Sequence, residues 1–153
     1  KRYTYRICNS RHGTALGRNL CAHVPLPLDE ALMHTAAQSL LGTHDFAAFQ
    51  ASGGTAKTTV RTLHRAEVSR SGEAVTLVVE GNAFLYNMVR IIAGTLIEIG
   101  LHRRAPDAFE RALASGDRLA LGVTAPACGL ELTEVYYSPE AFQAPEDVRW
   151  HEE

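Results

Sequence analysis

The segment that most constrains this chain is residues 82–100, NAFLYNMVRIIAGTLIEIG, which is apolar on nearly every side yet contains Arg90. A helix that is hydrophobic all round lies in a protein core. A guanidinium group cannot lose its proton, so its burial requires a carboxylate or phosphate partner. No acid stands one helical turn from Arg90, and Glu98 lies two turns away. Arg90 is therefore predicted to be one half of a site whose other half lies elsewhere.

The residues expected beside Arg90 on its helix face are mostly small or able to hydrogen-bond, among them Ala83, Asn87 and Gly94. Small residues next to a charge let another chain segment come close to it. The alternative interpretation is that the stem of Arg90 packs on the core while its charged head reaches water. This segment alone does not decide between the two interpretations.

Length and composition indicate one globular domain. The chain has 153 residues, of which 46% are hydrophobic and 21% charged, values typical of a soluble protein. Its net charge of -2 argues against an obvious polyanion binder. That argument is weak, because the acids in residues 145–153 mask a more basic remainder and a local basic face can coexist with an acidic tail.

The cysteines and histidines predict neither a disulfide scaffold nor a metal site. Cys8, Cys21 and Cys128 are widely spaced, and the seven histidines show no HExxH or HxH spacing. Three thiols suit a reducing compartment better than a disulfide scaffold, which predicts a cytoplasmic protein. No membrane span is expected, because Arg90 divides the longest apolar run.

Periodicity and turn signals predict an α+β fold, a largely antiparallel sheet with helices packed on one face. One domain is expected over residues 1–138, followed by a polar tail over residues 139–153. The predicted elements are strands over residues 1–9, 20–24, 57–70, 74–80 and 130–137, helices over residues 29–41, 82–100 and 106–115, and a loop over residues 43–56. The opening KRYTYRICNS alternates like the inside of a strand and indicates the middle of a longer protein.

The aspartates provide no convincing catalytic nucleophile. Asp29, Asp107 and Asp117 adjoin helix ends and Asp147 lies in the tail, so all four are interpreted as caps or solvated charges. Asp45, in GTHDF, is a weak candidate that is also well placed to cap a short turn. No GxSxG motif or Ser-His-Asp order is present.

A glycine-containing loop is a candidate contact for nucleic acid. The glycines Gly53 and Gly54, with Thr55 after them, expose backbone N–H groups, and Lys57 and Arg61 can meet phosphates. The alternative is a flexible loop that enters an edge strand.

Four segments resemble the C-terminal half of the tRNA pseudouridine synthase A (TruA) family. They are KRYTY at residues 1–5, LLGTHDFAAF at 40–49, FLYNMVRIIAGTLIEIG at 84–100 and APACGLEL at 125–132. The similarity runs in order over residues 1–137, and the helix centred on MVR paired with the GLEL strand is a specific combination.

The resemblance implies an enzyme that converts uridine to pseudouridine in the anticodon stem-loop of tRNA without a cofactor. The family's nucleophile is an aspartate in a GRTDAG motif of the N-terminal half, and that motif is absent from this sequence. By resemblance, Tyr3 stacks on the flipped uracil, Arg90 pairs with the nucleophilic aspartate and Leu130 floors the pocket. The loop from Gly53 to Lys57 would assist base flipping.

The leading expectation is therefore a chain that supplies the binding wall of a tRNA-modifying enzyme, inactive alone and part of a homodimer in the full-length protein. A non-catalytic RNA-binding or assembly module is the alternative, in which Arg90 meets a phosphate or a structural acid. A small α+β domain without a role in RNA is a third interpretation.

Overall fold

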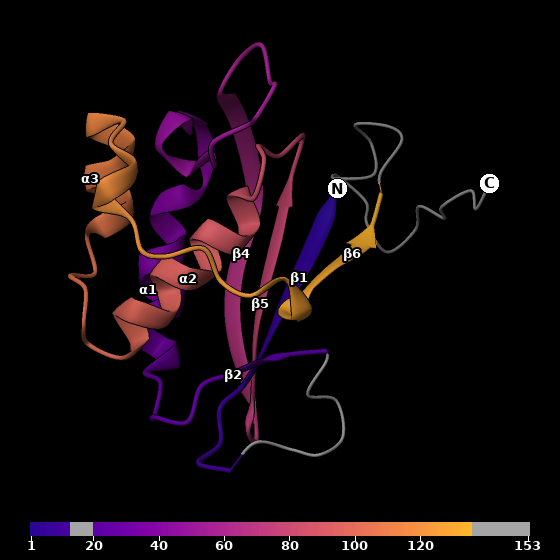
Figure 1. Ribbon diagram of the computed structural model, residues 1–153, viewed down its shortest axis with the longest axis vertical. Coiled ribbons are helices and arrows are strands. Elements are labelled where there is room, and N and C mark those ends of the chain that lie inside the picture. Colours follow the sequence, from indigo (N-terminus) through magenta and orange to yellow (C-terminus); the bar gives the residue numbers. More distant parts are fainter. Residues whose placement is uncertain (13–19, 136–153) are drawn as a thin grey trace.

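The computed structural model describes residues 1–12 and 20–135, which form one mixed sheet with a layer of helices on one side (Figure 1). The strands follow the order β2-β1-β5-β4-β3, and β6 pairs with β1. All pairs are antiparallel except β1 with β2. The strands are β1 Arg2–Cys8, β2 Ala22–His23, β3 Gly42–Asp45, β4 Val60–Ser71, β5 Ala74–Gly81 and β6 Leu130–Glu134.

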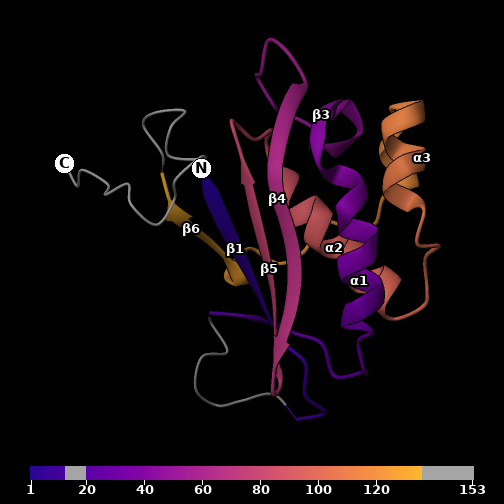
Figure 2. The same cartoon turned by 180° about the vertical axis from the view of Figure 1, so that it is seen from behind.

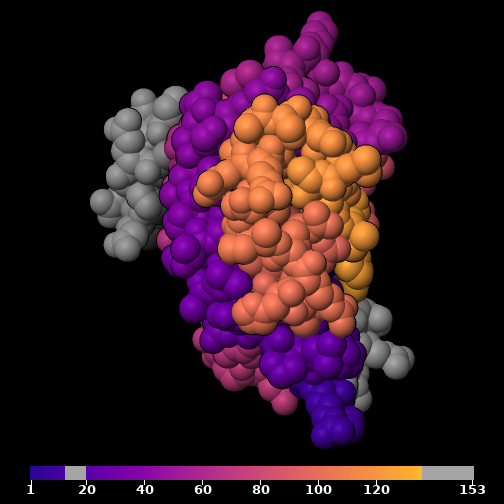
Figure 3. All heavy atoms as spheres, turned by 90° about the vertical axis from the view of Figure 1, so that its left-hand side faces the viewer, coloured from indigo at the N-terminus to yellow at the C-terminus, as the bar shows by residue number. Residues whose placement is uncertain are grey.

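The helices α1 Glu30–Ala37, α2 Met88–Gly100 and α3 Ala108–Ser115 lie on the same side of the sheet, as the views from front and back agree (Figure 2). Figure 3 shows the outside of this layer, where α3 and the segment after it lie beside α1. The predicted α+β class, with a largely antiparallel sheet and helices on one face, is confirmed. None of the described helices has both the length and the apolar character needed to cross a membrane.

Strand β1 alternates as predicted at residues 5–7, although Thr4 on the opposite face is also buried. Tyr5 and Ile7 are buried at 0% and 2% exposure, beneath the helices, while Arg6 is exposed. On β5, Val75, Leu77 and Val79 bury the same face of the sheet. Burying one face of each strand fixes the register, because a shift of one residue would turn every apolar side chain to solvent.

The predicted hairpin joins β4 and β5 through a turn at Gly72. This glycine has φ +60°, a left-handed conformation that side chains with a Cβ disfavour. The pairing extends from Ser71 opposite Ala74 to Leu63 opposite Gly81. The long β4 and β5 thus form the middle of the sheet, and β1 pairs beside them.

Helix α1 is shorter than predicted. Asp29 caps it, because its side chain accepts a hydrogen bond from the Leu32 N–H at 3.1 Å. The α-helix ends at Ala37, and residues 38–40 tighten into a 3-10 turn that buries Leu40. Asp29 therefore begins the helix as expected, but the α-helix ends four residues before the predicted end at residue 41.

The predicted loop over residues 43–56 is partly wrong, because it contains strand β3. Gly42–Asp45 pairs with β4 at the edge of the sheet, and three of its four residues are exposed. An edge strand with both faces polar has no apolar alternation, so periodicity misses it. A 3-10 turn, Ala47–Phe49, then buries Phe49, whose ring stacks on Phe109 of α3 at 5.9 Å.

The central helix begins six residues later than predicted. Helix α2 starts at Met88, and residues 82–87 form an irregular connection in which the Asn82 side chain accepts from the Thr62 and Ala83 N–H groups. Ile91 and Ile92 are completely buried. The prediction of a helix buried nearly all round is confirmed over residues 88–100, with its first turn set by local hydrogen bonds.

The C-terminal strand β6 runs from Leu130 to Glu134 along β1. The predicted strand extended to residue 137, but Val135 is already outside the strand, and residues 136–137 lie outside the described residues. The predicted tail, residues 139–153, and its boundary with the domain also lie outside them.

Candidate active site

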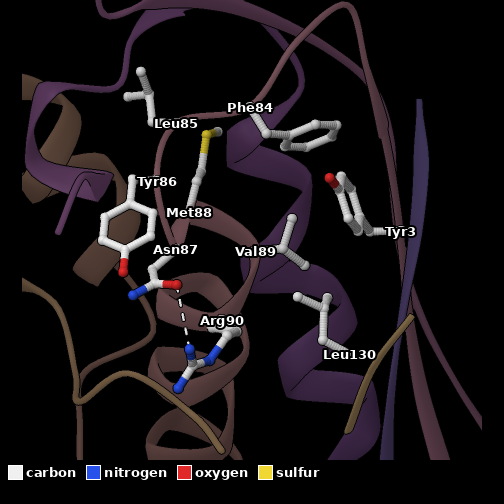
Figure 4. Close-up of a pocket in the computed structure, with 9 residues that line it drawn as sticks. All are labelled: Tyr3, Phe84, Leu85, Tyr86, Asn87, Met88, Val89, Arg90 and Leu130. Carbon is white, nitrogen blue, oxygen red and sulfur yellow. Dashed lines mark hydrogen bonds between the residues drawn. The ribbon is translucent and has the colours of Figure 1, made fainter. Parts of the chain in front are cut away.

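A pocket of about 240 Å³ opens where β1, the connection between β5 and α2, and the start of β6 meet (Figure 4). Its lining includes Tyr3, Arg90 and Leu130, the three residues that the resemblance implied for the uracil pocket. They come from sequence positions up to 127 residues apart (130 − 3), and the sheet brings them together. The rest of the lining consists of residues 84–89.

Arg90 is half-buried and held by two neutral acceptors. Its Nε donates to the Ala125 carbonyl at 2.8 Å, and its Nη1 donates to the Asn87 Oδ1 at 3.2 Å. Within residues 1–12 and 20–135, no carboxylate forms an ion pair with Arg90. The side chain is therefore fixed in orientation while its charge has no described counter-ion.

Gly94 explains how a second chain segment reaches Arg90. A Cβ at Gly94 would lie 1.7 Å from the Val123 carbonyl oxygen, so only glycine admits the backbone of residues 123–125. The Ala125 N–H donates to the Arg90 carbonyl at 3.0 Å, and the Ala125 carbonyl receives the Arg90 Nε. The expectation that a small residue permits close approach is confirmed at Gly94. Because residues 82–87 are not helical, Ala83 does not share a helix face with Arg90.

Tyr3 points from β1 into the pocket. Its ring is half-buried and meets Phe84 edge to face, with ring centroids 5.0 Å apart and planes at 86° (Figure 4). Pairing with Val79 on β5 and Leu132 on β6 fixes the strand on both sides. The ring is thus supported at its edge, and one wall of the pocket is aromatic.

Leu130 enters the pocket opposite Val89, at the point where the chain leaves a 3-10 turn (Figure 4). The preceding Gly129 packs directly on β1, because a Cβ there would lie 2.7 Å from both the Arg6 carbonyl oxygen and the Tyr5 ring. The Tyr5 hydroxyl donates to the Pro126 carbonyl at 2.6 Å. Burial raises the pKa of Tyr5 well above its usual value, so the hydroxyl remains a hydrogen-bond donor.

Tyr86 forms an exposed aromatic rim, with 56% of its surface accessible. Its carbonyl accepts the Ala51 N–H at 3.1 Å, which joins the pocket rim to the loop over residues 51–59. Sequence reasoning missed Phe84, and it placed Asn87 beside Arg90 without predicting the hydrogen bond between them. The aromatic and amide residues clustered in NAFLYN were a signal, but a helix assignment for that segment hid their arrangement.

The candidate nucleic-acid loop lies beside this rim and does not line the pocket. Gly53 has φ +92°, and Thr55 and Lys57 are exposed. The Arg61 side chain is already engaged by neighbouring residues, because its Nη1 donates to Thr58 Oγ1 at 3.2 Å and to the Val60 carbonyl at 2.8 Å. The phosphate contacts of Gly53, Gly54, Thr55, Lys57 and Arg61 stay predictions.

The described aspartates have structural partners outside the pocket. Asp45 accepts from the Ala47 N–H and the Thr59 hydroxyl, as its interpretation as a cap requires. Asp117 caps a turn through the Leu119 N–H. Asp107 makes no capping bond and instead pairs with Arg111 at 2.8 Å. Asp147 lies outside the described residues. The described residues also contain no group of metal-binding side chains.

The chain is similar in sequence to known proteins. A family described as tRNA pseudouridine synthase matches residues 36–138. The chain is 48% identical over 138 residues to tRNA pseudouridine synthase A 2 of Clostridium tetani, and 50% identical over 137 residues to tRNA pseudouridine synthase A of Geotalea uraniireducens. Each alignment covers 90% of this chain and 56% of the relative, so the chain spans about half the length of the curated relatives it matches. The chain belongs to the tRNA pseudouridine synthase family.

Proposed function

We propose that this chain supplies the C-terminal half of the active site and of the tRNA-binding surface of an enzyme that isomerises uridine to pseudouridine in the anticodon stem-loop. The observation that carries the proposal is Arg90, a fixed guanidinium with no described counter-ion in an aromatic pocket. The nucleophilic aspartate would come from the part of the complete protein that the relatives possess beyond this chain.

The reaction needs a nucleophile, a binding site for the base and no external reagent. Isomerisation breaks the bond between N1 and C1′, forms a bond between C5 and C1′, and exchanges the proton of C5 for one on N1. Atoms and electrons balance within the nucleoside, which is consistent with the proposed absence of a cofactor. A carboxylate that attacks covalently must remain ionised and correctly aimed.

Arg90 is suited to that task. Two of its five N–H donors are occupied by neutral oxygens, so three remain on Nη1 and Nη2. An opposite charge beside a carboxylate favours the ionised form, and a guanidinium fork adds directional hydrogen bonds. The nucleophilic carboxylate would thus be the counter-ion of the half-buried Arg90.

The aromatic wall is suited to a base taken out of its stack. An enzyme that acts on a stacked base must extrude it, at a cost of a few kcal/mol. Stacking on an aromatic side chain returns about 1–3 kcal/mol per base. Tyr3, supported at its edge by Phe84, provides such a platform, and Leu130 closes the apolar floor.

The RNA surface would extend from the pocket rim to the neighbouring loop. The Ala51–Tyr86 backbone hydrogen bond fixes that loop beside the pocket, and Lys57 is exposed on it. The exposed lysine provides a contact to phosphate, whereas the Gly54 N–H already donates to the Ala51 carbonyl at 3.3 Å. We further propose that the complete protein is a cytoplasmic homodimer. Cys8, Cys21 and Cys128 form no disulfide in the described part of the chain, which suits a reducing compartment.

The test is product formation by the complete protein that contains this chain. Unmodified tRNA is incubated with the protein, digested to nucleosides and separated by chromatography. Pseudouridine that maps to the anticodon stem-loop supports the proposal. Tight tRNA binding without pseudouridine would instead support the non-catalytic RNA-binding module.

A further inference from the structure

Asn87 has an unusual backbone at the mouth of the pocket. Its φ of 60° and ψ of 13° are left-handed, and His102 is the other non-glycine residue with positive φ in the described chain. Asparagine and aspartate adopt this conformation more readily than other residues with a Cβ. Asn87 occupies the N-cap position of α2, yet its side chain makes no capping bond.

The side chain of Asn87 contacts Arg90 instead. Its Oδ1 accepts from the Arg90 Nη1 at 3.2 Å (Figure 4). Because a guanidinium only donates, the amide oxygen must face it, and the amide nitrogen points away. With Nε bound to the Ala125 carbonyl at 2.8 Å, two acceptors at different nitrogens fix the planar group.

We infer that Asn87 is a positioning residue, whose left-handed backbone and neutral amide oxygen aim the Arg90 guanidinium at the incoming nucleophilic carboxylate. This inference rests on the proposed function. The hydrogen bond from the Arg90 Nε to Ala125 blocks the side of the guanidinium that carries Nε. The carboxylate would therefore approach the end formed by Nη1 and Nη2. The neutrality of the amide is essential, because a carboxylate at this position would pair with Arg90 and compete with the nucleophile.

Asn87→Asp is the discriminating variant in the complete protein. Aspartate has nearly the same shape and tolerates the same backbone, so a purely structural role would be preserved or strengthened. A positioning role predicts that kcat for pseudouridine formation falls about 10- to 100-fold, with KM for tRNA changed by less than about twofold. The melting temperature should not fall.

Asn87→Gly is the second variant. Glycine adopts the left-handed backbone without strain but has no amide, so kcat should fall by about tenfold with the fold retained. His102→Gly is the matched control. His102 has φ 59° and an exposed side chain away from the pocket, so this variant should keep wild-type kcat.

The outcomes separate the inference from the proposed function. Wild-type turnover by Asn87→Asp would overturn the inference while leaving the function intact. Parallel loss of melting temperature and tRNA binding in both Asn87 variants would also overturn it, because that pattern indicates a structural residue. A wild-type protein that makes no pseudouridine would refute the proposed function and this inference together.

Discussion

At the scale of single residues, Arg90 combines a permanent charge with two neutral hydrogen-bond partners. A free snorkelling arginine would reach water without fixed partners, whereas this one is anchored at Nε and Nη1. Half-burial adds a desolvation cost that an opposite charge would offset. This geometry is consistent with the prediction that Arg90 is one half of a site. The carboxylate that would pair with it is expected from outside this chain.

Replacing Arg90 with lysine should abolish most turnover in the complete protein. An ammonium group is a point charge that cannot bond Ala125 and Asn87 while presenting a fork to a carboxylate. We expect kcat to fall by about 100-fold or more, or about 2.7 kcal/mol of transition-state stabilisation, in a steady-state assay of pseudouridine formation.

Arg104→Lys is the matched control. Arg104 is also half-buried and also makes two bonds, to Glu98 and to the Ala120 carbonyl, but it lies outside the pocket. Its replacement should leave kcat unchanged. Near-normal activity in Arg90→Lys would mean that Arg90 is a packing residue with a solvated head.

Tyr3 should matter for its ring more than for its hydroxyl. Tyr3→Phe keeps both the stacking face and the edge contact with Phe84, and should bind tRNA almost as well as wild type. Tyr3→Leu should weaken binding by about 1–3 kcal/mol, the contribution of base–aromatic stacking. Equilibrium binding of tRNA measures both variants.

Melting temperatures distinguish the alternative, in which Tyr3 is a core residue of β1. That alternative predicts a lower melting temperature in both variants without selective loss of binding. A Tyr3→Phe variant that binds tRNA normally but forms no product would assign the hydroxyl a role in proton transfer.

At the scale of secondary-structure elements, the pocket depends on how the segment 123–130 is fastened to α2 and β1. Gly94 admits its backbone, Arg90 bonds Ala125 twice, and the Tyr5 hydroxyl bonds Pro126. These contacts deliver Leu130 to the pocket. A change in the surface of α2 should therefore propagate to the pocket floor.

Gly94→Ala should disrupt this arrangement. The new Cβ would meet the Val123 carbonyl oxygen, a backbone atom that can move only with its segment. Overpacking typically costs about 1–3 kcal/mol, and a clash with backbone belongs at or above the upper end of that range. We expect the free energy of unfolding, measured with urea, to fall by about 3 kcal/mol, together with a loss of activity.

Gly100→Ala on the same helix is the comparison. Its Cβ would meet the side chain of Met33, a flexible thioether that can adjust. Its loss of stability should be smaller than that of Gly94→Ala. Equal losses in the two variants would show that the approach of residues 123–125 is not the critical contact.

The elements also show what could be predicted from sequence and why. Alternation gave β1 and the hairpin, because each of these strands buries one face. It missed β3, an edge strand whose register comes from backbone pairing with β4 and leaves no apolar pattern. The helix predicted over residues 82–100 began too early. The hydrogen bonds of Asn82 and the left-handed backbone of Asn87 keep residues 82–87 out of the helix, and the composition of this segment does not reveal them.

The site divides in the same way. Arg90 was predicted from a conflict between charge and burial, which is visible in the sequence. Tyr3 and Leu130 were predicted only from the family resemblance, because nothing local to β1 or β6 marks them. Helical spacing placed Asn87 beside Arg90 as a residue able to hydrogen-bond, but the left-handed backbone from which it contacts Arg90 could not be predicted, because the segment was expected to be helical.

At the scale of the whole molecule, the chain brings together a pocket that we propose to be one wall of the active site. Tyr3, Arg90 and Leu130 come together from three distant parts of the sequence, but no described carboxylate lines the cavity. The relatives are nearly twice as long as their matched regions, which leaves room for a second wall. We therefore expect the isolated chain to retain its tRNA-binding surface but to lack catalytic activity.

The most direct test compares this chain alone with the complete protein, using tRNA tritiated at C5 of uridine. Release of tritium reports loss of the C5 proton during isomerisation. Circular dichroism and tRNA binding first establish that the isolated chain is folded and retains its RNA surface. We expect release by the complete protein and only background release by the folded chain. Release above background by the chain alone would contradict the half-site and would direct attention to Asp45 as the nucleophile.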